Sequence, residues 1–198
     1  MILAERLNAL PPRSLVAVAG PPGAGKSTIA ESLASEVKGA RVLPMDGFHL
    51  DDRILSARGH LPRKGAPHTF DVAGLARTLR AVREGGEVFH PVFDRSREIA
   101  IAGAGVIEPE MSGPVIVEGN YLLLDRPEWR ALGPWALTVF LSVPMEELER
   151  RLAARWTALT GDALTEKMEG NDLPNARLVM EDSIPADVTL HWPEDGMV

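Results

Sequence analysis

The sequence contains no cysteine among its 198 residues. This absence excludes disulfide bonds, thiolate metal sites and a cysteine nucleophile. Acidic residues outnumber basic ones by 28 to 21, so the net charge is −7, which argues against a general nucleic-acid binder because phosphate backbones attract basic surfaces. No apolar run is long enough to span a bilayer, and the charged residues 1–7 do not form a signal peptide. We therefore expect a cytoplasmic protein that binds neither nucleic acid nor a membrane.

The chain does contain a phosphate-binding pattern. Residues 20–27 read GPPGAGKS and follow the apolar run Leu15–Ala19, which places the pattern G-x-x-x-x-G-K-[ST] between a strand and a helix. Glycines let successive backbone N–H groups face a phosphate chain, and the helix adds the positive end of its dipole. We expect Lys26 to reach the β- and γ-phosphates of ATP and Ser27 to bind Mg²⁺. The expected nucleotide-binding residues are Gly20, Gly23, Ala24, Gly25, Lys26, Ser27 and Thr28.

The distribution of apolar segments predicts an α/β fold. Five short apolar runs are typical of buried strands and cover residues 15–19, 41–45, 115–117, 137–141 and 187–190. Helical patterns cover residues 27–37, 72–83 and 145–156. Strands that alternate with helices predict a five-stranded parallel sheet with helices on both faces, in three layers. Loops at the carboxyl ends of the strands then form the ligand-binding edge.

One segment, residues 48–113, is longer than a single crossover needs. Residues 98–101 and 106–108 flank the glycine-containing stretch 102–105, which predicts a small β-hairpin with a glycine turn. A surface excursion without function is the alternative, but long ordered insertions beside a ligand edge are usually functional. We expect one domain over 1–198, with a substrate-binding insertion at 48–113 and a lid region at 145–175.

Two acidic residues follow the second and third predicted strands. Asp46 comes after the second predicted strand, where a carboxylate can accept the proton of an attacking hydroxyl. Glu118 ends the apolar run of the third strand, a position that suits a Mg²⁺ ligand. The alternatives are a turn cap for Asp46 and an ion pair with arginine for Glu118. Together with the P-loop, these residues favour catalysis at Asp46 and metal binding at Ser27 and Glu118.

Basic residues supply further candidates. Arg151 and Arg155 share one helix face in the predicted lid and suit a transferring phosphoryl group, although pairing with nearby glutamates is the simpler alternative. Asn171 and Asn175 are expected to cap the last helix rather than to contact adenine. The residues expected to hold the substrate are Asp46, His49, Arg63, Lys64, Phe93 and Arg95.

These segments together resemble the uridine kinase, pantothenate kinase and phosphoribulokinase group of P-loop kinases. The resemblance covers Ser14 to Leu190 and rests on the order and spacing of six segments: 20–27, 45–49, 63–71, 91–94, 117–119 and 186–188. In size and motifs the chain is most similar to small bacterial kinases named for fructose transport. The resemblance implies a P-loop NTPase fold, Asp46 as the catalytic carboxylate, Glu118 as the Walker B acid and Arg151 or Arg155 as the lid arginine.

The expected function is ATP- and Mg²⁺-dependent transfer of the γ-phosphoryl group to a hydroxyl of a small molecule, acting alone or as a homodimer. A sugar such as fructose, a pantothenate-like alcohol and a nucleoside are the acceptors considered. Uridine kinases carry an acidic residue where this chain has Gly65, which argues against uridine. A nucleoside monophosphate kinase, which would use Arg63 and Lys64 for an acceptor phosphate, is one alternative. A non-catalytic ATP-binding regulator is the other, and the presence of Asp46 and Glu118 argues against it.

Overall fold

A computed structural model describes residues 3–157 and 159–192. Strands β1 (Leu15–Ala19), β2 (Arg41–Pro44), β5 (Val115–Gly119), β6 (Leu137–Ser142) and β7 (Val188–His191) form one sheet in the order β2-β5-β1-β6-β7. All four neighbouring pairs are parallel. The predicted five-stranded parallel sheet is therefore confirmed.

Helices cover both faces of this sheet. The longer ones are α2 (Lys26–Glu36), α4 (Val72–Glu84), α6 (Met145–Arg155) and α8 (Leu173–Asp182). The shorter ones are α1 (Leu3–Asn8), α3 (Asp52–Ala57), α5 (Pro127–Arg130) and α7 (Asp162–Lys167), with 3₁₀ turns η1 (Met45–Phe48), η2 (Leu61–Arg63) and η3 (Pro67–Thr69) and a π-helical turn η4 (Met168–Asp172). In the described ranges, no helix combines the length and apolar character needed to cross a membrane.

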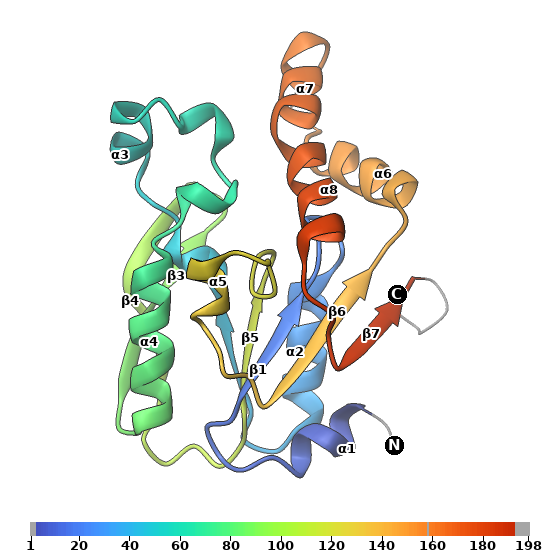
Figure 1. Ribbon diagram of the computed structural model, residues 1–198. Coiled ribbons are helices and arrows are strands. Elements are labelled where there is room, and N and C mark those ends of the chain that lie inside the picture. Colours follow the sequence, from blue (N-terminus) through green and yellow to red (C-terminus); the bar gives the residue numbers. More distant parts are fainter. Residues whose placement is uncertain (1–2, 158, 193–198) are drawn as a thin grey trace.

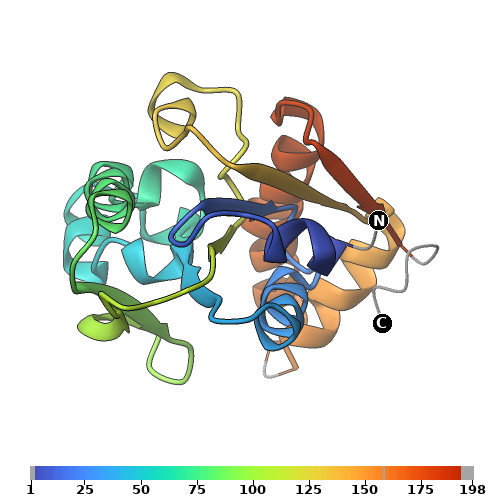
Figure 2. The ribbon, with the colours of Figure 1, turned by 90° about the horizontal axis from the view of Figure 1, so that it is seen from below.

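Alternation along β1 divides the core into two layers. Leu15, Ala17 and Ala19 face a cluster that contains residues of α4 and α5, whereas Val16 and Val18 face a cluster with residues of α1, α2 and α6. The view from below shows α2 and α5 on opposite sides of the sheet (Figure 2). Because β1 is buried on both faces, its sequence is continuously apolar, as parallel strands require.

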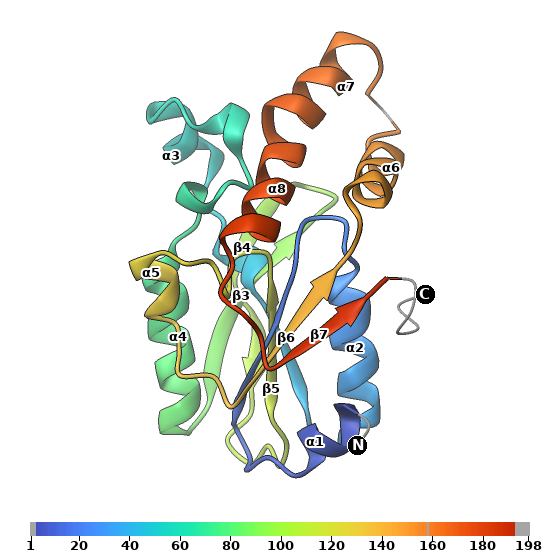
Figure 3. The ribbon, with the colours of Figure 1, turned by 45° about the vertical axis from the view of Figure 1, so that its right-hand side comes forward.

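The insertion and the lid rise from the same end of the sheet. α3 stands on one side and α7, with α8 below it, on the other (Figures 1 and 3). That end carries the carboxyl ends of β1, β2 and β5. One cavity is lined by residues of both segments together with Pro22 of the P-loop.

The hairpin of the insertion exists, but its predicted position was wrong. β3 (Val88–Asp94) pairs with β4 (Ile99–Ile107), so the turn lies at residues 95–98 and the two segments assigned to separate strands belong to one. The Asp94 carboxylate accepts hydrogen bonds from the backbone of Ser96 and Arg97 and closes this turn. Gly105 is needed for packing instead, because a Cβ there would lie 2.2 Å from the His90 ring.

Candidate active site

The P-loop folds as its sequence predicts. Gly23 and Gly25 have φ angles of 83° and 90°, which side chains would strain. Gly25 is also the N-cap of α2 and has no side-chain cap, so the first N–H groups of the helix are left for a ligand. Lys26 is 8 % exposed, and its Nζ donates to the Pro21 carbonyl at 2.9 Å. The loop is thus a preformed anion cradle whose lysine is held across it.

A first cavity, called here the P-loop cavity, lies over this cradle. Its lining residues are Pro22, Gly23, Gly25, Lys26, Ser27, Thr28, Asp46, Arg95, Glu118, Asn120 and Arg155. Asp46 and Glu118 meet there because β2 and β5 are neighbours and Pro44 is in register with Glu118. Gly20 and Ala24, expected to bind nucleotide, do not line it. Ala24 is buried, and a Cβ on Gly20 would approach the Leu141 carbonyl.

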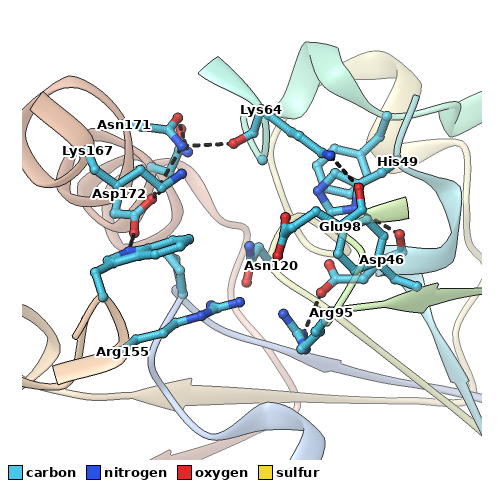
Figure 4. A pocket seen from close by; sticks show the side chains of 16 residues that line it. Asp46, His49, Lys64, Arg95, Glu98, Asn120, Arg155, Lys167, Asn171 and Asp172 are labelled. Atoms are coloured by element: carbon cyan, nitrogen blue, oxygen red, sulfur yellow. Dashed lines mark hydrogen bonds and ion pairs between the residues drawn. The ribbon is translucent and has the colours of Figure 1, made fainter. Parts of the chain in front are cut away.

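A second cavity, the insertion cavity, adjoins the first (Figure 4). Its lining residues are Pro22, Asp46, His49, Lys64, Gly65, Phe70, Phe93, Arg95, Glu98, Asn120, Arg155, Trp156, Lys167, Asn171, Asp172 and Asn175. Both cavities share Pro22, Asp46, Arg95, Asn120 and Arg155. A group bound in one can therefore meet a group bound in the other beside Asp46.

Burial shapes the electrostatics of the P-loop cavity. It lowers the pKa of Lys26 to about 8, although the negative charges of Glu118 and Asp46 oppose the shift. Burial, together with the charge of Asp46, raises the pKa of Glu118, which is 5 % exposed. The charges of Asp46 and Glu118 repel each other, and the Ser27 hydroxyl lines the same cavity. A divalent cation bound between these groups would relieve the repulsion. Within residues 3–157 and 159–192, no cluster of three His, Asp or Glu side chains could hold a metal ion alone. Mg²⁺ bound by Ser27 and Glu118 would take its other ligands from phosphates and waters.

The predicted lid arginines differ in their surroundings. Glu147 accepts hydrogen bonds from both Arg150 and Arg151, which lowers the pKa of this carboxyl to about 2. Arg151 also donates to the Gly23 carbonyl at 3.3 Å and packs on the Trp192 ring, but it lines neither cavity. Arg155 lines both. Its position already carried a signal, because neither the third nor the fourth residue before it is acidic.

Arg63, expected to hold substrate, lies outside the insertion cavity. Its guanidinium donates to the Gly170 carbonyl and, at 3.0 Å, to Asn175 Oδ1. Asn171 Nδ2 donates to the Lys64 carbonyl at 2.8 Å and Asn175 Nδ2 to Asn171 Oδ1 at 3.0 Å. These residues form a latch between η2 and the lid. The prediction that Asn171 and Asn175 cap a helix was wrong, because their side chains are committed to this latch.

The other expected substrate residues meet in the insertion cavity. Asp46 Oδ2 lies 2.7 Å from Arg95 Nη2. His49 packs between Phe70 and Phe93, with ring centroids 4.1 and 4.7 Å away. Lys64 Nζ contacts Asp52 and the Glu98 carbonyl. Sequence reasoning gave no role to the further lining residues Glu98, Asn120, Lys167 and Asp172.

Comparison with known proteins identifies kinases among the relatives. No family model matches the sequence. The chain is 37% identical over 193 residues to the uncharacterized protein YggC of Escherichia coli K12, covering 93% of this chain and 80% of that protein. It is 30% identical to a "putative uridine kinase", C227.14, of Schizosaccharomyces pombe, covering 90% and 83%. The crystal structure of a "putative fructose transport system kinase" from Silicibacter sp. TM1040 matches with 45% identity and a TM-score of 0.87, covering 96% and 99%.

Proposed function

Because this chain belongs to the uridine kinase, pantothenate kinase and phosphoribulokinase group of P-loop kinases, we propose that it transfers the γ-phosphoryl group of ATP to a hydroxyl of a small molecule. The observation that carries this proposal is the junction of the two cavities. The P-loop cavity suits the nucleotide phosphates, the insertion cavity suits the acceptor, and Asp46 lines both.

The residues of the chain divide the work between them. Lys26 and the backbone N–H groups at the start of α2 would hold the β- and γ-phosphates. Ser27 and Glu118 would hold Mg²⁺, which when bound neutralises phosphate charge and orients the terminal phosphoryl group. Because Lys26 is buried and held to the Pro21 carbonyl, it needs little reorganisation to meet a phosphate oxygen.

Asp46 is the proposed general base. It accepts the proton of the acceptor hydroxyl as that oxygen forms its bond to the γ-phosphorus and the bond from this phosphorus to the bridging oxygen breaks, leaving ADP. Arg155, which has no carboxylate partner within the described residues, and Arg95 line both cavities, so either can neutralise charge on the moving group. Their guanidinium forks suit phosphoryl oxygens.

The geometry gives less support to the alternatives. A nucleoside monophosphate kinase would need free cations for an acceptor phosphate, yet Arg63 is held in the latch and Lys64 pairs with Asp52. A non-catalytic nucleotide sensor would have no need for a carboxylate at the junction of two cavities. Phosphoryl transfer to an alcohol gives a role to Asp46, Arg95 and Arg155, the charged residues that line both cavities.

The substitution Asp46→Asn tests this function because it keeps the shape of the side chain and removes the base. We expect turnover, measured as ADP release over a panel of alcohols, to fall about 10²- to 10⁴-fold. ATP affinity by calorimetry should change little. Asp125→Asn, which removes an exposed carboxylate paired with Arg130 outside both cavities, serves as the control. Wild-type turnover in Asp46→Asn would remove Asp46 from the mechanism.

A further inference from the structure

The cations of the insertion cavity already have partners. Three of the four within the described residues form ion pairs, and the fourth, Arg155, stands at the junction with the P-loop cavity. The pairs are Lys64–Asp52 at 2.7 Å, Arg95–Asp46 at 2.7 Å and Lys167–Asp172 at 3.4 Å. The part of the cavity away from the P-loop therefore offers no unpaired positive charge to an acceptor.

In contrast to these paired cations, the Glu98 carboxylate has no partner among the residues that the structure describes. Its carboxylate points into the cavity (Figure 4) and has no hydrogen bond or ion pair within the described part of the chain, although its backbone carbonyl accepts from Lys64. Its φ angle is 54°, in the left-handed region that glycine or asparagine prefers at the end of a hairpin turn. Glu98 is exposed in the structure, and residues with this backbone conformation are uncommon and cluster at functional sites.

Two neighbouring groups extend this pattern. His49 Nδ1 lies 2.8 Å from the Asp46 carbonyl oxygen, which can only accept, so Nδ1 carries the proton. Burial lowers the pKa of His49, which keeps the ring neutral and leaves Nε2 as an acceptor. Asn120 also lines the cavity, and its amide has no hydrogen-bond partner within the described residues (Figure 4). In this part of the chain, the lining groups without a hydrogen-bond partner thus include the Glu98 carboxylate and His49 Nε2, which accept, and the Asn120 amide, which both donates and accepts.

We propose that the acceptor is an uncharged polyhydroxylated molecule, and that Glu98 recognises it through hydroxyl groups other than the one phosphorylated. This inference rests on the proposed function and narrows its substrate class. Hydroxyl groups supply the donors that the Glu98 carboxylate and His49 Nε2 lack, and the carbon face of a polyol packs on Phe93. An acceptor carboxylate or phosphate would instead meet the unpaired charge of Glu98.

The test compares uncharged acceptors with charged derivatives of the same compounds. ADP release is measured with a free hexose, the corresponding hexonate and the hexose phosphate, and in a second arm with nucleosides and their monophosphates. We expect the uncharged member to be preferred in at least one arm. The preferred arm distinguishes a free sugar from the ribose of a nucleoside as the source of the hydroxyl groups.

Substitutions at Glu98 complete the test. In Glu98→Gln we expect the KM for the uncharged acceptor to rise about tenfold or more, with a smaller change in kcat and unchanged ATP affinity. Glu98→Gly should raise KM in the same way while the protein becomes at least as stable to heat, because glycine tolerates the positive φ. The control is Glu110→Gln, an exposed glutamate outside both cavities.

Three results would decide against the proposal. A preference for the charged member of each pair, or a wild-type KM in Glu98→Gln, overturns the assignment of Glu98 and leaves the kinase function standing. If none of the tested acceptors supports ADP release although ATP still binds, the proposed function and this inference are both overturned.

Discussion

Arg95 and Asp46 form an ion pair of 2.7 Å across the junction of the two cavities. Asp46 follows β2, whereas Arg95 belongs to the turn between β3 and β4, so the hairpin brings a cation to the proposed base. The Arg95 side chain is 53% exposed, and an ion pair this accessible contributes little to stability. Its importance is therefore expected in catalysis: a nucleotide phosphate in the P-loop cavity would compete for Arg95 and free the Asp46 carboxylate.

The substitution Arg95→Met tests this exchange of partners. We expect kcat to fall about 10²-fold, as found when one donor to a developing charge is removed, while the melting temperature stays nearly constant. Steady-state kinetics and thermal unfolding measure the two effects. Arg97→Met is the matched control, because Arg97 lies in the same turn and lines neither cavity. An equal loss of kcat in both variants would point to damage to the turn instead.

The lowered pKa of Lys26 predicts how nucleotide affinity depends on pH. The ammonium group binds phosphate only when protonated, and phosphate favours that form. With a pKa of about 8 in the free protein, ATP affinity should be constant near neutral pH and fall towards tenfold per pH unit above about pH 8. Calorimetric titrations across this range measure the slope.

Lys26→Met is the control for that titration. It should bind ATP more weakly at neutral pH and lose most of the decline on the alkaline side, because methionine does not titrate. If the variant kept the wild-type slope, the titrating group would have to be a different one.

Arg63 provides a test of the latch between insertion and lid. Arg63→Ala removes the hydrogen bonds to the Gly170 carbonyl and to Asn175, so amide exchange in residues 168–175 should accelerate. We expect the acceptor KM to rise several-fold, since the latch residues beside Lys64 line the insertion cavity, with ATP affinity nearly unchanged. Hydrogen-exchange mass spectrometry and kinetics measure the two effects.

Arg58→Ala, an exposed arginine just after α3, is the matched control for this variant. A raised KM in Arg63→Ala without faster exchange in 168–175 would argue for direct contact between Arg63 and the acceptor.

Local patterns were sufficient for most of the scaffold. The continuous apolar run before the P-loop predicted β1, because a parallel strand buried on both faces cannot alternate. Asp46 and Glu118 were placed at one edge because the carboxyl ends of parallel strands lie at the same edge of a sheet, and in the structure both line one cavity. The hairpin turn was misplaced because glycines were taken as turn residues, whereas Gly105 makes room for the His90 ring from another strand.

The partners of the basic side chains could not all be predicted from the sequence. Arg151 and Arg155 looked equivalent on one helix face, yet Glu147 lies within one turn of the first and not of the second. Arg63 and Lys64 were candidates for binding an acceptor phosphate, but in the structure Arg63 hydrogen-bonds to Asn175 and Lys64 pairs with Asp52. A charged side chain pairs with an oppositely charged or polar group that lies near it in the folded protein, and that group can be far away in the sequence.

The sequence by itself determined the sheet, the P-loop and the two acids at the strand ends, because these depend on short-range periodicity and on the fixed direction of parallel strands. Only the tertiary structure decided which groups line the insertion cavity: Glu98 and Asn120 come from turns far apart in the chain, and both line it. Their placement depends on how the insertion, sheet and lid pack together, and no local pattern encodes that packing.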